Sequence, residues 1–238
     1  MLRFCVVIPT YNEADTIAEV VRGVEDAGAG LVVVVDDGST DGTVQVVERL
    51  AEKYSNVVLV ERGRKLGIGS AIKDGMRRAL QNDPELRALV TMDADMSHDP
   101  SEVPKLVEPC EEDAVVVGSR YVEGGVIEGW GVHRRLVSKT ANLIARSILG
   151  VAVRDATSGF RCYGRMVAEA LLRVSRESGF VFQVEALYKA QRMGYRLIEV
   201  PITFIARRVG KSKLDLGEIF EFLGAVRRML LWTPPKEF

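Results

Sequence analysis

The chain has 238 residues, which is enough for one large α/β domain or two small ones. Its net charge of −1 gives no reason to expect a nucleic-acid partner, and its hydrophobic fraction of 47% is ordinary for a soluble globular protein. The three cysteines are scattered without metal-ligand spacing, which excludes a disulfide framework and favours a reducing compartment such as the cytoplasm. No apolar run approaches the roughly 20 residues that span a bilayer, so we expect no transmembrane segment and no leader.

The first 100 residues alternate between short apolar runs and helical patterns. Four apolar runs are expected strands, at residues 3–8, 31–35, 57–60 and 88–92. Helical spacing of apolar residues lies between them, over 14–27, 44–50 and 67–79. Continuously apolar strands that alternate with helices are typical of a parallel sheet covered on both faces. We therefore predict an α/β fold with a mostly parallel, Rossmann-like sheet and helices on both faces.

The second half is less regular. A short helix at 103–111 and a strand at 114–118 precede a glycine-rich stretch, 121–133, of the kind that forms functional loops. Residues 155–161 read as a polar turn, and 196–205 as a strand that Pro201 confines to a sheet edge. Further helices are expected at 134–149, 165–174, 181–193 and 216–232. No strong linker interrupts the chain, so we predict a single domain.

Acidic residues follow three of the expected strands. Asp93 and Asp95 come directly after the strand at 88–92, Asp36 and Asp37 after the second strand, and Glu13 after the first. Ligands of open α/β sheets bind beyond the carboxyl ends of the strands. Two carboxylates one residue apart repel each other, and a hard divalent cation that also holds phosphate oxygens would relieve that repulsion.

Two other α/β classes fit these acids less well. A phospho-acceptor receiver domain would end near the middle of the chain and would need an aspartate after the third strand, where Glu61 and Arg62 stand. A dinucleotide-dependent oxidoreductase needs G-x-G-x-x-G directly after a strand, and the glycines at 67 and 69 lack the third member.

Basic residues gather in the second half, many of them in glycine-bearing loops rather than on helix faces. They are Arg120, Arg134, Arg135, Arg154, Arg161, Arg207, Arg208, Lys211 and Lys213. Guanidinium groups match phosphate oxygens well. The first half therefore suits a metal-bound nucleotide, and the second half suits another anion.

Several motifs resemble those of family-2 glycosyltransferases with the GT-A fold. They are VIPTYNE at 7–13, VDDGSTD at 35–41 and MDAD at 92–95. Three more narrow the resemblance to the dolichyl-phosphate (polyprenyl-phosphate) mannose synthases, namely GSRY at 118–121, SGFR at 158–161 and R-x-x-G-x-S-K at 207–213. The motifs keep the family's order over nearly the whole chain.

The resemblance implies one glycosyltransferase domain over 1–238, with a nucleotide-sugar half at 1–100, an acceptor half at 101–213 and a C-terminal amphipathic helix at 214–238. It implies an inverting transfer of mannose from GDP-mannose to a dolichyl or polyprenyl monophosphate, with Mg²⁺ or Mn²⁺. A dolichyl-phosphate glucosyltransferase that uses UDP-glucose is the alternative. A sugar nucleotidyltransferase is more distant, because a glycine-rich phosphate loop is missing after the first strand. A non-enzymatic binding module is the least favoured alternative, because acids and arginines at several loops are costly without a ligand.

The resemblance also implies roles for individual residues. Those for the nucleotide sugar are Pro9, Tyr11, Glu13, Val35, Asp37, Asp93, Ala94, Asp95, Arg207 and Lys213. Asp93 and Asp95 would also hold the metal, and Ser97 stands where many relatives carry Gln. Arg120, Arg134 and Ser138 would bind the acceptor phosphate, with Asp95, Arg120 and Arg134 as the residues that carry catalysis.

The family includes forms with transmembrane helices, and this chain resembles the short form without them. We therefore expect a peripheral protein on the cytoplasmic face of a membrane, attached directly or through a small membrane-anchoring subunit. The expected helix at 216–232 is apolar over more than half its circumference and carries Arg227, Arg228 and Trp232. Such a helix can lie at a bilayer interface or pack on the protein's own core.

Overall fold

The structure, a computed structural model, describes residues 3–206 and 216–235, and the side chains of 3–206 and 221–235. Seven strands form the central sheet: β1 (Phe4–Thr10), β2 (Leu31–Asp36), β3 (Val57–Glu61), β4 (Ala88–Thr91), β5 (Ala114–Ser119), β7 (Arg161–Gly164) and β8 (Arg196–Pro201). Their spatial order is β3-β2-β1-β4-β7-β5-β8. β7 runs antiparallel to both neighbours and the other neighbouring pairs are parallel, which confirms the predicted mostly parallel sheet.

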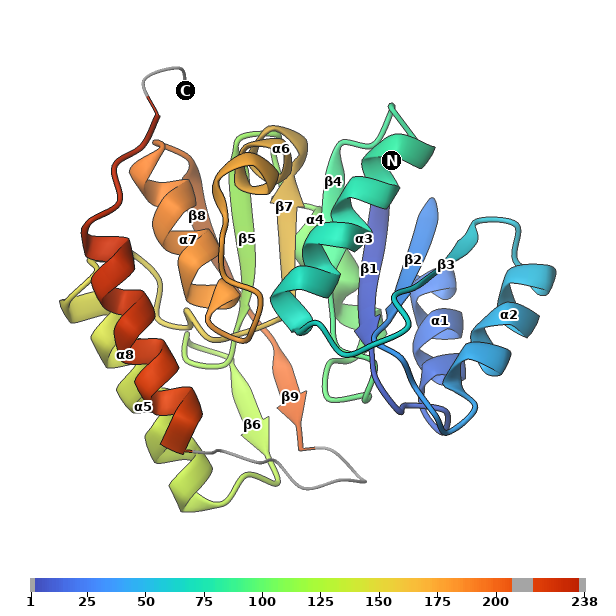
Figure 1. Cartoon of the computed structure of the whole chain (residues 1–238), viewed down its shortest axis with the longest axis horizontal. Helices are drawn as coiled ribbons and strands as arrows, with labels where there is room; N and C mark the ends of the chain where they lie inside the picture. Colours follow the sequence, from blue (N-terminus) through green and yellow to red (C-terminus); the bar gives the residue numbers. More distant parts are fainter. Residues whose placement is uncertain (1–2, 207–215, 236–238) are drawn as a thin grey trace.

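Helices cover both faces of this sheet (Figure 1). Their bounds are α1 (Ile17–Asp26), α2 (Thr43–Lys53), α3 (Ile68–Asn82), the 3-10 turn η1 (Pro100–Glu102), α4 (Val103–Val107), α5 (Val132–Ser147), α6 (Arg165–Val174), α7 (Phe182–Arg192) and α8 (Leu216–Leu230). In Figure 1, α3 and α7 lie in front of the sheet.

The core has two layers because successive side chains of each strand point to opposite faces. On β1, Cys5 and Val7 pack with α3, α6 and α7, whereas Val6 and Ile8 pack with α1, α2 and α4. Gly75 lets α3 lie close to β1, since a Cβ there would clash with the Val7 side chain. Both faces are thus buried, which explains why the strands read as unbroken apolar runs rather than alternating ones.

Three sequence-based expectations need correction. The polar turn at 155–161 leads into β7, a strand that the sequence analysis missed. The single strand expected at 196–205 is divided at Ile202 into β8 and β9 (Thr203–Ile205), although β8 does lie at the sheet edge as predicted. The glycine-rich stretch contains β6 (Val126–Glu128), which pairs in parallel with β9 as a separate two-stranded sheet. Figure 1 shows this pair beyond the carboxyl ends of the central strands.

Candidate active site

The loops that follow β1 and β2 are joined by side-chain hydrogen bonds. Asn12 accepts from the Thr40 backbone N–H at Oδ1, 2.8 Å away, and its own N–H donates to Ser39 Oγ, also at 2.8 Å. The Glu13 N–H donates to Thr43 Oγ1 at 2.9 Å. Asn12 adopts φ 58°, a left-handed conformation that Asn tolerates better than most residues. The two motifs of the nucleotide half therefore form one rim at the sheet's carboxyl edge.

Asp36 and Asp37 serve different purposes in this rim. Asp36 Oδ1 accepts from the N–H groups of Gly38 and Ser39, at 2.9 and 2.8 Å, and so holds its own turn. Asp37 is also buried, and its Oδ2 accepts from the Gly67 N–H at 3.0 Å, at the start of α3. Its Oδ1 lies 3.1 Å from Arg62 Nε. The structure thus shows Asp37 bound to protein groups, and its contact with a nucleotide sugar stays a prediction.

The other residues predicted for the nucleotide differ in accessibility. The Tyr11 ring is 41% exposed, with Lys65 Nζ 4.5 Å from its centroid, so it offers a face on which a base could stack. Pro9 and Val35 are register partners at the ends of β1 and β2. Val35 is fully buried in the core, so its side chain is not open to a ligand. Arg207 and Lys213, also predicted here, lie outside the described residues.

The acidic turn after β4 is fixed by hydrogen bonds. Asp95 is 6% exposed, and its Oδ1 accepts from the Ser97 N–H at 3.0 Å. The Asp93 N–H donates to His98 Nδ1 at 3.2 Å, and the Asp93 side chain remains 28% exposed. Met96, at φ 58°, turns the chain directly after Asp95. Asp93 is therefore the more open of the two carboxylates, and Ala94 between them is buried.

This turn fits an oxygen-liganded cation, although it does not complete a metal site. Among the described residues no group of three or more His, Cys, Asp or Glu side chains is arranged to hold a metal. Ser97 Oγ is buried and makes no hydrogen bond within the described part of the chain. A hard cation prefers oxygen ligands, so a diphosphate would have to supply the oxygens that the described residues do not provide.

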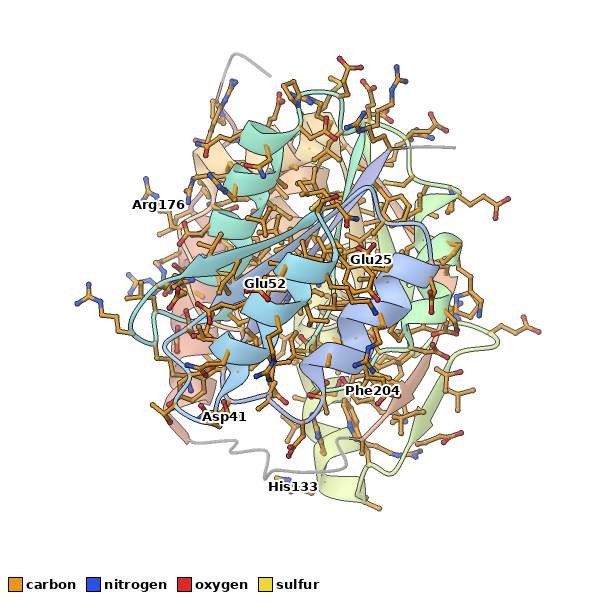
Figure 2. All side chains as sticks on the ribbon, turned by 90° about the vertical axis from the view of Figure 1, so that its right-hand side faces the viewer. Glu25, Asp41, Glu52, His133, Arg176 and Phe204 are labelled. Atoms are coloured by element: carbon orange, nitrogen blue, oxygen red, sulfur yellow. The ribbon has the colours of Figure 1, made fainter. Side chains whose placement is uncertain are left out.

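A chain of rings leads from the acidic turn to the second half of the protein. His98 is buried, stacks on Phe160 at 5.0 Å and meets the edge of Phe204 at 5.4 Å between centroids. Burial lowers the pKa of His98, although the carboxylates of Asp93 and Asp95 oppose this effect. Phe204 in turn meets Trp130 at 5.1 Å. Figure 2 shows Phe204 at the same end of the molecule as Asp41, in the loop that follows β2.

The guanidinium of Arg120 is already hydrogen-bonded to other residues of the protein. Its Nε and Nη2 donate to Asp155 Oδ2 and Oδ1, both at 2.7 Å, and Nη2 also donates to Thr157 Oγ1 at 2.8 Å. Burial alone would lower the pKa of Arg120, but the charge and hydrogen bonds of Asp155 outweigh it and raise that pKa. Among the described residues, the guanidinium hydrogen bonds of Arg120 come from Nε and Nη2, so its predicted phosphate contact would have to come from Nη1.

The structure brings the three predicted acceptor residues together. Tyr121 Oη donates to Ser138 Oγ at 3.0 Å, and Ser138 lies 3.3 Å from Thr157 Oγ1, which Arg120 also contacts. Arg134 joins them through Trp130, whose ring centroid lies 4.4 Å from the Arg134 guanidinium carbon.

Sequence reasoning missed several side chains of this region. Asp155, Thr157 and His98 were not assigned roles. Their partners Arg120, Ser138 and Phe204 lie 35, 19 and 106 positions away in the sequence, so no local spacing marks them. The SGFR motif is a sequence signal for this region. A Cβ at its Gly159 would lie 3.5 Å from Asp93 Oδ1. The motif therefore passes beside the acidic turn.

Comparison with known proteins defines the class. Residues 5–172 match the family model described as "Glycosyl transferase family 2", and the chain belongs to this family of glycosyltransferases. Solved structures of glucosyl-3-phosphoglycerate synthase from Mycobacterium tuberculosis, one with Mn²⁺, UDP and glucosyl-3-phosphoglycerate, match with a TM-score of 0.68 at 23% identity, covering 99% of this chain and 82% of that one. That likeness confirms the predicted GT-A fold.

Two curated relatives are more similar in sequence. The chain is 39% identical over 223 residues to the polyprenol monophosphomannose synthase of Mycolicibacterium smegmatis, covering 92% of this chain and 83% of that protein. It is 36% identical over 229 residues to the undecaprenyl-phosphate mannosyltransferase of Micrococcus luteus, covering 95% and 93% respectively.

Proposed function

We propose that this glycosyltransferase moves mannose from GDP-mannose to a polyprenyl monophosphate, with inversion at the sugar carbon. The names of the two curated relatives support the sugar and the acceptor class. The observation that carries the proposal is the pairing of two anion-handling regions. The acidic turn at Asp93 and Asp95 and the basic cluster at Arg120 and Arg134 are connected through His98, Phe204 and Trp130.

In the donor region, Asp93 and Asp95 would hold a Mg²⁺ or Mn²⁺ ion together with the diphosphate. Such an ion supplies positive charge that stabilises a leaving diphosphate. The chain's own part is to keep the carboxylates in place: the Ser97 N–H orients Asp95, and His98 accepts from the Asp93 N–H. The exposed Tyr11 ring offers a stacking surface for the base.

In the acceptor region, the reaction requires positive charge more than it requires proton transfer. A phosphate monoester is already an anion at neutral pH, so its attack on the sugar needs little help from a general base. The helix α5 begins at Val132, and the backbone N–H groups of its first turn would face a phosphate held by Arg134 and Ser138. Arg120 Nη1 would complete this set.

A radiolabel transfer assay tests the proposal directly. Purified protein is given GDP-mannose or UDP-glucose, a short polyprenyl monophosphate and Mn²⁺, and the lipid fraction is counted. We expect mannosyl transfer and little glucosyl transfer. Label that enters the lipid only from UDP-glucose would instead identify the glucosyltransferase alternative, and label from neither donor would overturn the proposed function.

We also propose that the protein reaches its acceptor by lying on a membrane surface. Within the described residues, no helix has both the length and the apolar character needed to cross a bilayer. On α5, Val132, Leu136 and Leu143 are exposed, and they fall on one stripe at helical spacing. On α8, Ala225 and Met229 are buried against the core while Leu223 and Leu230 remain exposed. The helix therefore packs on the core with one face and leaves another available to lipid.

Liposome flotation measures this attachment. We expect the full-length protein to float with vesicles that contain anionic lipid, and Leu136→Asp with Leu143→Asp to leave most of it in the soluble fraction, because the charges oppose insertion of the α5 stripe. Met166→Asp is the matched control, since Met166 is a similarly exposed apolar residue on α6. Equal flotation of the α5 variant and the control would contradict attachment through α5.

A further inference from the structure

Trp130 occupies the space between the two arginines of the acceptor region. The guanidinium carbons of Arg134 and Arg120 lie 4.4 and 5.0 Å from its ring centroid. Cations this close to an indole face are attracted by the ring quadrupole. The ring also meets Phe204 at an interplanar angle of 67°. Three side chains from three different segments therefore determine where this ring lies.

The backbone around Trp130 is held as firmly as its ring. Arg135 reaches back from the first turn of α5, where its Nη2 donates to the Ile127 carbonyl at 2.8 Å and its Nε to the Trp130 carbonyl at 3.3 Å. Gly129 has φ +73°, and a Cβ there would lie 2.9 Å from the Ala206 Cβ. The Ala206 N–H donates to the Glu128 carbonyl at 2.9 Å. Trp130 is thus a built-in part of the site.

The indole N–H of Trp130 has no acceptor within the described part of the chain. Its Nε1 is buried and makes no hydrogen bond to any described residue. Buried donors are nearly always paired, so an unpaired one points to a partner that the described residues do not supply. The charged groups that contact this ring, Arg120 and Arg134, are both cations and cannot accept a hydrogen bond. An anion with free oxygens could accept from the Trp130 N–H and from both neighbouring guanidinium groups.

We propose that Trp130 is a further binding residue for the acceptor phosphate, which it contacts through its indole N–H while its ring fixes the guanidinium of Arg134. The ligand class is a phosphate monoester whose oxygens accept from Trp130 Nε1 and the two arginines. This assignment rests on the proposed transfer to a polyprenyl monophosphate. The Trp130 N–H would thus be an uncharged hydrogen-bond donor that orients the phosphate, in a site whose positive charge comes from arginines.

Steady-state kinetics with Trp130→Phe separates the N–H from the ring, because Phe keeps an aromatic face for Arg134. We expect kcat/KM for the polyprenyl phosphate to fall roughly tenfold, the value of one hydrogen bond to a charged acceptor. The dissociation constant of the nucleotide sugar should stay within twofold. Arg134→Ala serves as the reference, with an expected loss of roughly ten- to a hundredfold. A kcat/KM within threefold of wild type, or an equal loss of donor affinity, would overturn the assignment.

Tryptophan fluorescence gives a second readout that does not need catalysis. The chain has two tryptophans, and Trp232 packs by Tyr188 and Lys189, on α7. In Trp232→Phe, which should retain full activity, Trp130 is the single reporter. We expect a saturable change in emission on titration with farnesyl monophosphate and none with farnesol. No response to either, or the same response to both, would overturn the assignment.

The two proposals can fail separately. A wild-type protein that transfers neither mannose nor glucose overturns the proposed function, whereas a phosphate-dependent change in Trp130 emission would still show an anion at this position. Conversely, an active enzyme whose Trp130 emission ignores farnesyl monophosphate keeps its function and loses this binding residue. Trp130→Phe, which retains only Trp232, is the blank for the titration and should not respond.

Discussion

Asp95→Asn is expected to reduce kcat by at least about a hundredfold, because a bound cation contributes several kcal/mol of charge stabilisation to a leaving diphosphate. The substitution removes a charged oxygen from the acidic turn but preserves the shape of the side chain. The fold should survive, since the remaining amide oxygen can still accept from the Ser97 N–H that now donates to Oδ1 at 3.0 Å. The measurement is mannosyl transfer as a function of Mn²⁺ concentration, with thermal unfolding to check stability.

Asp99→Asn is the matched control for this experiment. Asp99 is exposed, and its Oδ1 accepts from the Ser101 N–H at 2.9 Å, so it repeats the local hydrogen bond of Asp95 four residues further along. We expect wild-type turnover from Asp99→Asn. Undiminished transfer by the wild type in excess EDTA, or a kcat for Asp95→Asn equal to that of the control, would show that no metal acts at this turn.

The strands that stand out most clearly in the sequence are those with both faces buried. β1, β2 and β4 lie inside the sheet, so every residue favours an apolar side chain and the strand stands out as an unbroken run. β7 lies inside the sheet as well but begins with Arg161, which is fully buried. Its guanidinium donates to the carbonyls of Ala156 and Gln183. In the sequence, a buried arginine whose hydrogen bonds go to backbone carbonyls elsewhere in the chain looks like a loop residue. For this reason β7 was not predicted.

The residues of the candidate site also divide into those whose position the sequence predicts and those whose pairing only the tertiary structure shows. The positions of Asp93 and Asp95 were predictable, because the carboxyl ends of strands are where ligands collect in open α/β sheets. The pairing of Asp37 with Arg62 and of Arg120 with Asp155 was not, since each joins residues separated by 25 or more positions through tertiary structure. Motif resemblance predicted a functional role for Arg120, but only the structure shows that most of its donors are already used within the protein.

Asp155→Ala is expected to destabilise the fold by about 3–5 kcal/mol, the usual cost of leaving one member of a buried ion pair without its partner. Asp155 is 0% exposed and Arg120 7%, so water cannot replace the lost carboxylate. The Arg120 guanidinium cannot escape by losing its proton. The same carboxylate also accepts from the Arg120 backbone N–H at 3.0 Å, which would lose its acceptor too. Urea unfolding at neutral pH measures the loss.

Asp113→Ala provides the comparison, because Asp113 accepts from Arg196 Nη2 at the same 2.7 Å but at the surface, where both side chains are about half exposed. Exposed pairs contribute little to stability, so this variant should unfold nearly as the wild type does. If the two variants unfold at similar urea concentrations, the Arg120–Asp155 pair does not hold the acceptor region together.

The pH dependence of the Asp155→Ala effect follows from the same pair. Burial alone would raise the pKa of Asp155, but the charge and hydrogen bonds of Arg120 outweigh it and lower that pKa in the folded protein. The carboxylate of Asp155 therefore binds a proton less readily in the folded state than in the unfolded chain, where an aspartate has a pKa of about 3.9. The stability difference between wild type and Asp155→Ala should be complete above that pH and shrink as the pH falls toward the lowered pKa of Asp155. A difference that instead grows on acidification would mean that Asp155 is protonated in the folded protein, and Arg120 would then need another counterion.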